Sequence, residues 1–404
     1  MTSTILSLNA GSSSLKFALH GVGAEGALDT IASGMIEGIG RAPHLVVHGP
    51  DGETICERRW EAGEKLSHEA LLDSLLEWIE GHAGADTLIG IGHRVVHGGT
   101  EFAAPVLITD AVLGQLDRLC PLAPLHQPHN LAAIRAAIGM RPRLPHIACF
   151  DTAFHSTLPA VATRFALPRA LEREGVRRYG FHGLSYDYVS RRLAQIDPEL
   201  ANGRVIAAHL GNGASLCALV KGRSVDTTMG FTALDGLMMG TRCGAIDPGV
   251  LLYLEQEKGL SPDEVQHLLY EESGLLGVSG SSGDMRDLLG REDVGAGEAV
   301  ELFVYRIGRE AGALASVMGG LDGLVFTAGI GENAPEIRAR VCRRLTWLGI
   351  ALDERANEDG AAIISTADSR VRVRVIPTDE ERMIALHARA LIGDSKGKPH
   401  DADR

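Results

Sequence analysis

The chain has 404 residues, which is long enough for two domains that each bury a core. Its net charge is −13, and its short Lys/Arg clusters form no basic stripe, which argues against a nucleic-acid partner. With no charged leader segment and no apolar run of about 20 residues, the sequence predicts a cytoplasmic protein with no membrane partner.

The six cysteines are scattered without Cys-X-X-Cys spacing, and several lie in apolar runs. We therefore predict buried, reduced thiols rather than a disulfide or zinc framework. The last residues, 395–404, are polar and are predicted to be disordered.

The first predicted element is a β-hairpin with a turn of small residues. Apolar residues over 5–8 and at alternate positions over 15–19 flank this turn. Backbone N–H groups and the hydroxyls of the serines at 12–14 suit a phosphate, and Lys16 adds positive charge. Taken alone, the pattern fits an ordinary serine-rich hairpin equally well.

The rest of the first half alternates short strands with a helix. Strands are predicted at 44–47 and 88–91, with a helix near 69–80 between them. The first domain is expected to end near residue 150.

The hairpin pattern occurs a second time over 205–220. Ser14-Leu15 and Ser215-Leu216 are separated by 215 − 14 = 201 positions, about half the chain. Internal similarity at this distance predicts two related domains. Two phosphate-accepting hairpins across a cleft would suit a polyphosphate.

Two helices are predicted near 250–257 and 298–318, followed by a buried strand at 324–328. A tight glycine-rich turn is expected over 329–333, and Pro335 opens a helix that runs to about residue 348. Such a turn allows a ligand close to the backbone, although an ordinary strand-to-helix turn is an equally good explanation.

Near the end, residues 371–376 alternate with period two and predict a strand with one buried face. Thr378 and Glu381 have the spacing of a capping box, and a helix follows over 382–391.

Ten stretches of the chain, in order and spread over nearly its whole length, resemble the acetate kinase family, which shares a superfamily with actin, sugar kinases and chaperone ATPases. They read LNAGSSSLKF (8–17), GHRVVHGG (92–99), PLAPLHQPHN (121–130), FDTAFH (150–155), RRYGFHG (177–183), HLGNGAS (209–215), MGFTALDGLMMGTRCGAIDPG (229–249), SGSSGDMRD (279–287), FTAGIGEN (326–333) and IPTDEE (376–381).

The resemblance implies an α/β fold of two duplicated ribonuclease-H-like domains, with mixed sheets flanked by helices and a cleft between the domains. It implies an acceptor-side domain over 1–150, joined by the C-terminal helix at about 382–394. A nucleotide-binding and dimerisation domain is expected over 151–381, and the protein is expected to be a homodimer.

The implied activity is reversible, Mg²⁺-dependent transfer of the γ-phosphoryl group of ATP to acetate, giving acetyl phosphate and ADP by direct in-line transfer. Mn²⁺ is a possible substitute for Mg²⁺. A kinase for propionate or another short-chain acid remains an alternative. An actin-like or chaperone-like ATPase switch is the other, although Arg94, Arg242 and His182 argue against a protein without an acceptor site.

Four residues are expected to be catalytic. By resemblance, Arg94 and Arg242 hold the acceptor carboxylate and the transferring phosphoryl group, although a lone arginine is more commonly part of a structural salt bridge. His182 is expected to donate to phosphoryl oxygens. The family makes Asp151 the acid/base residue, but an acceptor carboxylate is already ionised near neutrality, so we expect Asp151 to orient an arginine and metal-bound water instead.

The resemblance also assigns binding residues. The acceptor's methyl group is expected among Val96, Leu125, Phe181 and Ala233, and Arg94 binds its carboxylate. The metal is expected at Asn9 and Glu380. The nucleotide is expected at Lys16, His209, Leu210, Gly211, Asn212, Gly213, Asp284, Met285, Arg286, Gly329, Ile330, Gly331, Glu332 and Asn333.

Some assignments have open alternatives. Asp284 and Arg286 have the spacing of a simple surface ion pair, and a packed histidine explains His126 as well as a site role does.

The chain departs from the family pattern at three positions. Ala233 stands where proline is common, which leaves more room beside the methyl group. Cys243 and Ala245 replace a serine and an acidic residue next to Arg242. These differences bear on acceptor selectivity and on the rate rather than on the fold.

Overall fold

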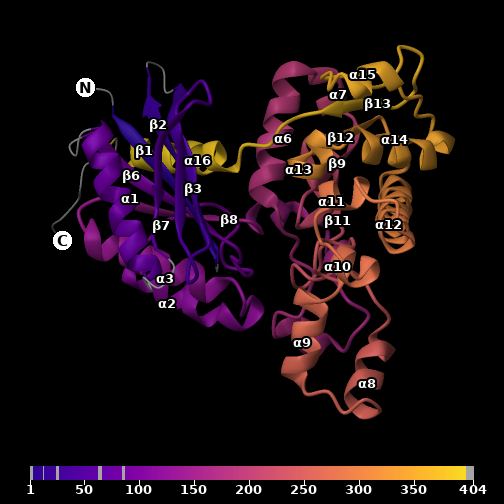
Figure 1. Cartoon of the computed structure of the whole chain (residues 1–404), viewed down its shortest axis with the longest axis horizontal. Coiled ribbons are helices and arrows are strands. Elements are labelled where there is room, and N and C mark those ends of the chain that lie inside the picture. The colour runs from indigo at the N-terminus through magenta and orange to yellow at the C-terminus, as the bar shows by residue number, and fades with distance from the viewer. Residues whose placement is uncertain (1–2, 12, 24–26, 62–65, 84–86, 397–404) are drawn as a thin grey trace. The chain divides into compact units, whose positions relative to one another are not determined.

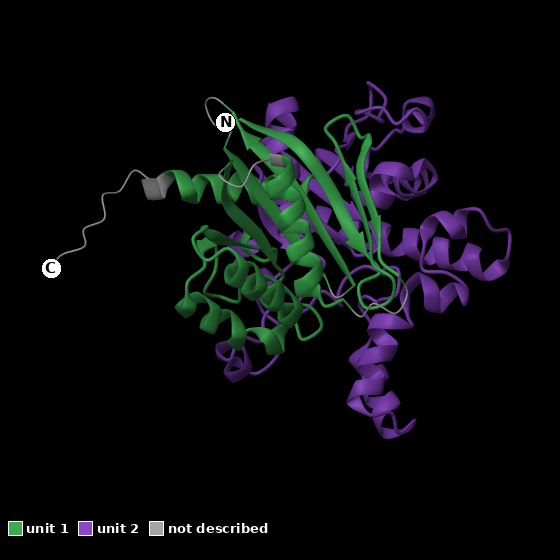
Figure 2. Cartoon of the chain, turned by 60° about the vertical axis from the view of Figure 1, so that its left-hand side comes forward, with its two compact units in different colours: residues 1–153, 379–404 green, residues 154–378 purple. Residues whose placement is uncertain are grey.

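The computed structural model describes all residues except 1–2, 12, 24–26, 62–65, 84–86 and 397–404 (Figure 1). The chain divides into two compact units: unit 1 comprises residues 1–153 and 379–404, and unit 2 comprises residues 154–378 (Figure 2). Asp151 and Glu380, which the sequence reading places in the second domain, therefore belong to unit 1.

Unit 1 is built on an eight-stranded mixed sheet in the order β5-β4-β3-β2-β1-β6-β8-β7. Strands β1, β6 and β8 run parallel to one another, and the other neighbouring pairs are antiparallel. The strands are β1 (Thr4–Ala10), β2 (Ser14–Val22), β3 (Leu28–Glu37), β4 (His44–His48), β5 (Thr54–Arg59), β6 (Leu88–Val95), β7 (Val106–Leu107) and β8 (His146–Phe150). The predicted first hairpin is confirmed as β1–β2.

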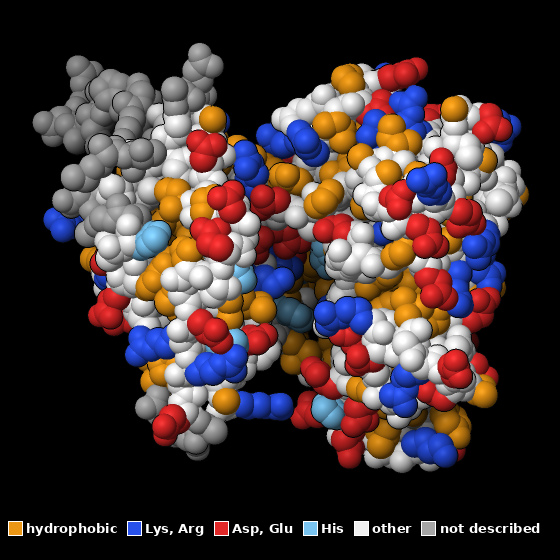
Figure 3. All heavy atoms as spheres, turned by 45° about the horizontal axis from the view of Figure 1, so that its top comes forward, with side chains coloured by type: hydrophobic (Ala, Val, Ile, Leu, Met, Phe, Trp, Pro, Cys, Tyr) orange, Lys and Arg blue, Asp and Glu red, His pale blue; other side chains and the backbone are white. Residues whose placement is uncertain are grey.

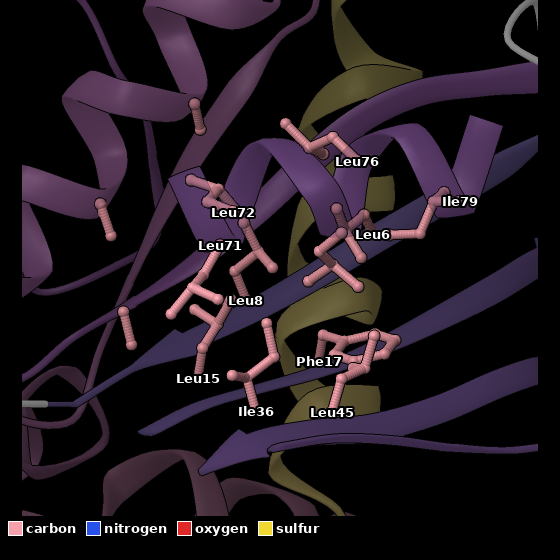
Figure 4. Close-up of a cluster of buried hydrophobic side chains, with 14 of the residues drawn as sticks. Leu6, Leu8, Leu15, Phe17, Ile36, Leu45, Leu71, Leu72, Leu76 and Ile79 are labelled. Carbon is pink, nitrogen blue, oxygen red and sulfur yellow. The ribbon is translucent and has the colours of Figure 1, made fainter. Parts of the chain in front are cut away.

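One face of this sheet packs against α1 (His68–Ala83) and α3 (Gln127–Met140). Leu6, Leu8 and Phe17 alternate along β1 and β2 and meet Leu72 and Leu76 of α1 (Figure 4). These side chains are almost completely buried, and removal of such apolar surface from water is the main source of stability. The period-two pattern therefore selects the face of each strand that contacts α1.

The opposite face of unit 1 is covered by the C-terminal helix α16 (Glu380–Lys396). A Cβ added at Gly92 would lie 2.5 Å from Ile384 Cγ2, and one added at Gly90 would lie 2.4 Å from Ile392 Cδ1. The two glycines of β6 thus allow the helix to pack directly on the strand backbone.

Helices α2 (Asp110–Arg118) and η3 (Cys120–Leu122) complete unit 1.

Unit 2 has a five-stranded sheet in the order β11-β10-β9-β12-β13. Its strands are β9 (Arg204–Leu210), β10 (Ala214–Val220), β11 (Arg223–Thr227), β12 (Gly323–Thr327) and β13 (Arg372–Val375). Its helices are η4 (Ala153–Thr157, starting at the unit boundary), α4 (Ala160–Thr163), α5 (Arg169–Arg173), α6 (Gly183–Ile196), α7 (Pro198–Ala201), α8 (Pro248–Gln256), α9 (Pro262–Glu271), α10 (Gly274–Ser279), α11 (Met285–Leu289), α12 (Val294–Met318), α13 (Ala328–Asn333), α14 (Pro335–Arg344), η5 (Thr346–Leu348) and α15 (Glu354–Glu358).

The two units repeat one architecture. Five strands of unit 1, in the order β3-β2-β1-β6-β8, correspond to the whole sheet of unit 2, and in both an antiparallel hairpin continues into two parallel strands. The first long helix after each final strand belongs to the other unit: α6 follows β8, after three short helices, but lies in unit 2, and α16 follows β13 but lies in unit 1. The predicted duplicated α/β fold is confirmed.

Two local predictions around the last strand are wrong. The helix α16 is capped by Asp379, whose Oδ1 accepts from the Arg382 N–H at 2.8 Å, so Thr378 and Glu381 do not form the predicted capping box. In the predicted strand, Arg374 is buried as well as Val373, because its guanidinium pairs with Asp197 at 2.8 Å. An ion pair covers the face that was expected to be open.

The segment predicted as a tight turn, 329–333, is instead most of the short helix α13. Its first residue, Ala328, has a φ of 64°, which supplies the sharp change of direction that the glycines were expected to provide. Pro335 opens α14 as predicted, but this helix ends at Arg344 and a 3₁₀ turn follows.

The remaining predictions are mixed. All six cysteines are free, but only Cys149, Cys217 and Cys342 are buried. Ser395 and Lys396 lie in α16 rather than in a disordered tail, and residues 397–404 are outside the described residues, as is Ser12.

No helix among the described residues is both long enough and apolar enough to cross a bilayer. Acidic and basic side chains are interspersed on the face shown in Figure 3.

Candidate active site

In unit 1, Arg94 lies between Asp151 and Asn9. Its Nε and Nη2 donate to the Asp151 carboxylate, with the shortest distance 2.6 Å, and its Nη1 donates to Asn9 Oδ1 at 3.1 Å. Asp151 is buried, whereas 23% of the Arg94 side chain remains exposed. The structure therefore brings together three of the predicted residues around one guanidinium.

The sheet topology explains this meeting. Asn9 is near the end of β1, Arg94 is near the end of β6, and Asp151 follows β8 directly. These strands are parallel neighbours, so their carboxyl ends meet at one edge, where ligands bind in α/β proteins.

The loop after Arg94 is fixed by side chains rather than by a strand ladder. The N–H groups of Val96, His97 and Gly98 donate in turn to Asn130 Oδ1 (3.0 Å), Gln127 Oε1 (3.2 Å) and Thr152 Oγ1 (3.0 Å). Asn130 and Gln127 come from the first turns of α3 and are buried.

Asn130 also joins the two segments that carry the site. Its Nδ2 donates to the Ala10 carbonyl at 2.6 Å while its Oδ1 accepts from Val96 N. It thereby links the residue after Asn9 to the residue two positions after Arg94. The sequence reading missed this role, although the PLAPLHQPHN stretch that contains Asn130 was a signal.

Glu380, in the first turn of α16, interacts electrostatically with Arg94 and Asp151. Burial raises the pKa of Glu380 to about 7; Arg94 lowers it, Asp151 and Glu381 raise it, and Lys16 lowers it. Burial tends to lower the pKa of Arg94, but Asp151, Glu380 and Glu381 more than reverse this effect, so the guanidinium stays charged.

Lys16 is exposed and lines a cavity of about 840 Å³ in unit 1. Asp379 and Glu381 line the same cavity, together with His20, which is buried and has no hydrogen-bond partner among the described residues. The predicted phosphate-facing lysine is therefore available to a ligand on this side of unit 1.

Unit 2 contains a cavity of about 760 Å³ at the end of its central strands. Eight of the predicted nucleotide residues line it: Gly211, Asn212, Asp284, Met285, Arg286, Gly329, Ile330 and Asn333. Its other lining residues were not predicted, although Gly283 lies inside a predicted motif and the rest lie within three residues of one: Leu289, Ala334, Pro335 and Glu336. The cavity has room for a nucleotide-sized ligand.

The remaining predicted nucleotide residues have other positions. Leu210 and Gly331 are buried. Glu332 Oε1 accepts from the N–H groups of Ala328 (2.7 Å) and Thr378 (3.0 Å), which ties α13 to the segment before α16.

The surface-pair interpretation of Asp284 and Arg286 also has support. Asp284 caps α11 and pairs with Arg286 at 2.6 Å, and 89% of the Arg286 side chain is exposed. The pair nevertheless forms part of the cavity wall.

Next to this cavity, two side-chain nitrogens converge on Gly213. A Cβ added at Gly213 would lie 2.9 Å from Arg242 Nη2 and 3.2 Å from His182 Nε2. Only glycine leaves this space open. Arg242 Nη1 in turn donates to the Ala233 carbonyl at 2.6 Å, so the departure from the family pattern at Ala233 is in direct contact with Arg242 through the backbone.

His182 precedes α6 with a φ of 58°, a conformation that few non-glycine residues adopt. Its ring stacks on that of His209 with centroids 4.1 Å apart. The structure thus groups His182, His209, Gly213 and Arg242 in unit 2.

The predicted methyl pocket is divided between the units. Val96 and Leu125 belong to unit 1, and Phe181 and Ala233 belong to unit 2. Their grouping around one methyl group remains a prediction.

Comparison with known proteins identifies the class of site. The model of the acetokinase family matches residues 4–386. The chain belongs to the acetokinase family. A curated relative, the acetate kinase of Rhodopseudomonas palustris (strain ATCC BAA-98 / CGA009), is 55% identical over 391 residues, which cover 96% of this chain and 98% of the relative.

Solved structures of the family agree. A propionate kinase from Francisella tularensis has a TM-score of 0.89 at 37% identity, covering 96% of this chain and 99% of its own. The acetate kinase of Porphyromonas gingivalis has a TM-score of 0.85 at 38% identity, covering 96% and 100%. The predicted fold and the predicted phosphotransferase activity towards a carboxylate are confirmed, and acetokinases use ATP and a divalent metal.

Proposed function

We propose that this acetokinase catalyses reversible transfer of the γ-phosphoryl group of ATP to acetate, giving acetyl phosphate and ADP by direct in-line transfer. The observation that carries the proposal is the convergence of Arg242 and His182 on Gly213, beside the cavity that Gly211 and Asn212 line. Phosphoryl transfer depends mainly on positioning and on stabilisation of negative charge, and these residues supply N–H donors for that purpose.

We assign the acceptor carboxylate to Arg94. A guanidinium presents several donors in one plane, and those that face Asp151 and Asn9 leave the head group only partly used and partly exposed. Asp151 fixes the plane of the guanidinium. Because an ionised acceptor has no proton to lose, Asp151 acts as an orienting residue in this mechanism and moves no proton.

We assign the metal to Asn9 and Glu380. The described residues contain no group of three or more His, Cys, Asp or Glu side chains able to hold a metal, so a candidate metal has few protein ligands, as Mg²⁺ prefers. The raised pKa of Glu380 reflects burial and neighbouring carboxylates. A divalent cation favours the ionised form of Glu380 and therefore offsets both effects. When bound, Mg²⁺ neutralises charge on the β- and γ-phosphates, and Mn²⁺ is a candidate replacement.

The acceptor preference is proposed as acetate, with propionate as the second candidate. Ala233 favours the second candidate, because its small side chain leaves room where the family commonly has proline. The structural similarity to a propionate kinase is compatible with either acid.

The test is a panel of short-chain acids assayed with ATP and hydroxylamine trapping of the acyl phosphate. Acetate-dependent formation of acetyl hydroxamate and ADP in equal amounts supports the proposal. ATP hydrolysis without dependence on any acid contradicts it and favours an ATPase switch.

We further propose that a second copy of the chain packs on α8. None of the residues of this helix is buried, although its sequence is mainly apolar, and Val250, Leu252 and Tyr253 are 44%, 54% and 51% exposed. Exposed apolar surface of this kind commonly marks an interface between proteins.

Leu252→Asp is expected to convert a dimer into a monomer in light scattering coupled to gel filtration, because it buries a charge in the interface. Val161→Asp, at an 85% exposed site elsewhere in unit 2, serves as the control. A wild-type monomer, or a dimer unaffected by Leu252→Asp, contradicts the assignment of α8.

A further inference from the structure

Behind His182, two buried hydroxyl groups form a chain that ends at the imidazole. Tyr186 Oη lies 2.5 Å from Ser215 Oγ, and Ser215 Oγ lies 2.8 Å from His182 Nδ1. Tyr186 and Ser215 have no exposed surface, and His182 is 8% exposed. Tyr186 comes from the first turn of α6 and Ser215 from β10, so both positions are fixed by regular structure.

The direction of this chain follows from the supply of donors. The Tyr186 hydroxyl contacts Ser215 Oγ and the backbone of His209; the His209 contact tends to lower the pKa of Tyr186, so it is an N–H donor, which leaves Ser215 Oγ to accept the hydroxyl proton. A buried O–H without an acceptor is unfavourable, so Tyr186 donates to Ser215. Burial raises the pKa of Tyr186 well above its ordinary value, so the phenol stays protonated and acts as a hydrogen-bond donor.

Ser215 has one proton and accepts from Tyr186, so its proton is directed to His182 Nδ1. An Nδ1 that accepts a hydrogen bond places the proton of a neutral imidazole on Nε2. His182 Nε2 is the atom that lies against Gly213 beside Arg242.

We propose that Tyr186 and Ser215 are positioning residues that hold His182 in the tautomer with a proton on Nε2, so that it presents an N–H donor to the transferring phosphoryl group. This inference rests on the proposed function for the role of His182. A donor fixed before the reaction needs no reorganisation as negative charge redistributes, whereas the other tautomer presents a lone pair to an anion.

The neighbouring histidine shows why Tyr186 matters. His209 Nδ1 lies 2.8 Å from Ser185 Oγ, which lies 2.8 Å from Thr378 Oγ1. Thr378 is only half-buried, so its hydroxyl can donate to water instead of to Ser185, and that chain satisfies its donors in either direction. In the hydrogen-bond chain behind His182, the fully buried hydroxyl of Tyr186 must donate to Ser215, which fixes the direction of that chain.

The experiment is NMR of the full-length protein with isotopically labelled histidine, using the two-bond nitrogen–proton correlations to assign the tautomer without substrates. The wild type is expected to show His182 with the proton on Nε2, assigned by its loss in His182→Ala. Ser215→Ala and Tyr186→Phe are expected to weaken or abolish this preference. A wild-type His182 protonated on Nδ1, or a tautomer unchanged in both variants, overturns the inference.

Kinetics provide the second readout. Ser215→Ala is expected to lower kcat about tenfold with little change in the KM values for ATP and acetate, and Tyr186→Phe is expected to fall between it and the wild type. Tyr305→Phe, at a 49% exposed site, is the matched control. Unchanged kcat in both variants overturns the inference. An unchanged kcat in His182→Ala, with the tautomer as expected, contradicts the proposed role of His182 instead.

Discussion

The same hairpin occurs once in each unit, but the two copies have different surroundings. Lys16 in β2 and Cys217 in β10 are separated by 217 − 16 = 201 positions, the interval of the repeat. Lys16 is exposed and lines a cavity in unit 1, whereas Cys217 is fully buried beneath α6, and burial raises its pKa to about 12. Whether a helix packs on one face of the hairpin therefore decides whether that face is open to a ligand or forms part of a core.

The helices that follow each repeat show a second difference. The first turn of α16 contributes Glu380, beside Arg94 and Asp151 in unit 1. The start of α6 contributes His182, which lies against Gly213 in unit 2. Equivalent helix ends therefore carry a carboxylate in one unit, to which we assign a metal, and an imidazole in the other, to which we assign the phosphoryl group.

Arg94→Lys tests the arrangement in unit 1 and has the largest expected effect of the substitutions there. A lysine keeps the charge but cannot donate to Asp151 through two nitrogens and to Asn9 at the same time. We expect kcat/KM for acetate to fall about 100-fold, measured in steady state. Arg135→Lys, which alters an exposed pair with Asp117, is the control.

If kcat/KM for acetate falls less than about tenfold in Arg94→Lys, donation to Asp151 through two nitrogens is unimportant and a single positive charge is sufficient. That result would make unit 1 a general cationic surface rather than a shaped carboxylate site.

Asn130→Asp sharpens the comparison by loosening the loop of unit 1 alone. The new carboxylate accepts from Val96 N but has no proton for the Ala10 carbonyl, so one of two clamping bonds is lost. We expect the KM for acetate to rise about tenfold while the KM for ATP stays unchanged. Equal increases in both KM values would show that the effect is not confined to unit 1. Asn202→Asp, at an exposed site, is the control.

Ala233→Pro concerns acceptor choice and has the smallest expected effect. A pocket that excludes one methylene discriminates against it by about 1–3 kcal/mol. Because Ala233 leaves room for that methylene, we expect the wild type to use propionate with a kcat/KM within about tenfold of acetate. Proline should widen the preference for acetate. An acetate-to-propionate ratio that does not change would show that the side chain at position 233 does not shape the acceptor pocket.

Hydrophobic periodicity and the repeated hairpin predicted individual strands and two related domains, whereas the ribonuclease-H-like fold was implied by the resemblance to the acetate kinase family. That resemblance also named Gly211, Asn212 and Asp284, which stand in motifs and line one cavity. The sequence was not sufficient for Asn130, Ser215 or Tyr186 as supporting residues, since each acts through a partner far away in sequence. The capping error at Thr378 had a related cause, because Asp379 competes for the same helix end and only the backbone shows which residue starts the helix.

The central claim is that Arg242 and His182 act on the transferring phosphoryl group. Arg242→Ala, assayed with saturating ATP, acetate and Mg²⁺ alongside calorimetric ADP binding, tests it most directly. The account predicts a loss of about 100-fold or more in turnover, with ADP affinity and the thermal midpoint little changed. A loss of less than about tenfold would contradict the claim, and so would a loss of turnover explained entirely by lost ADP binding.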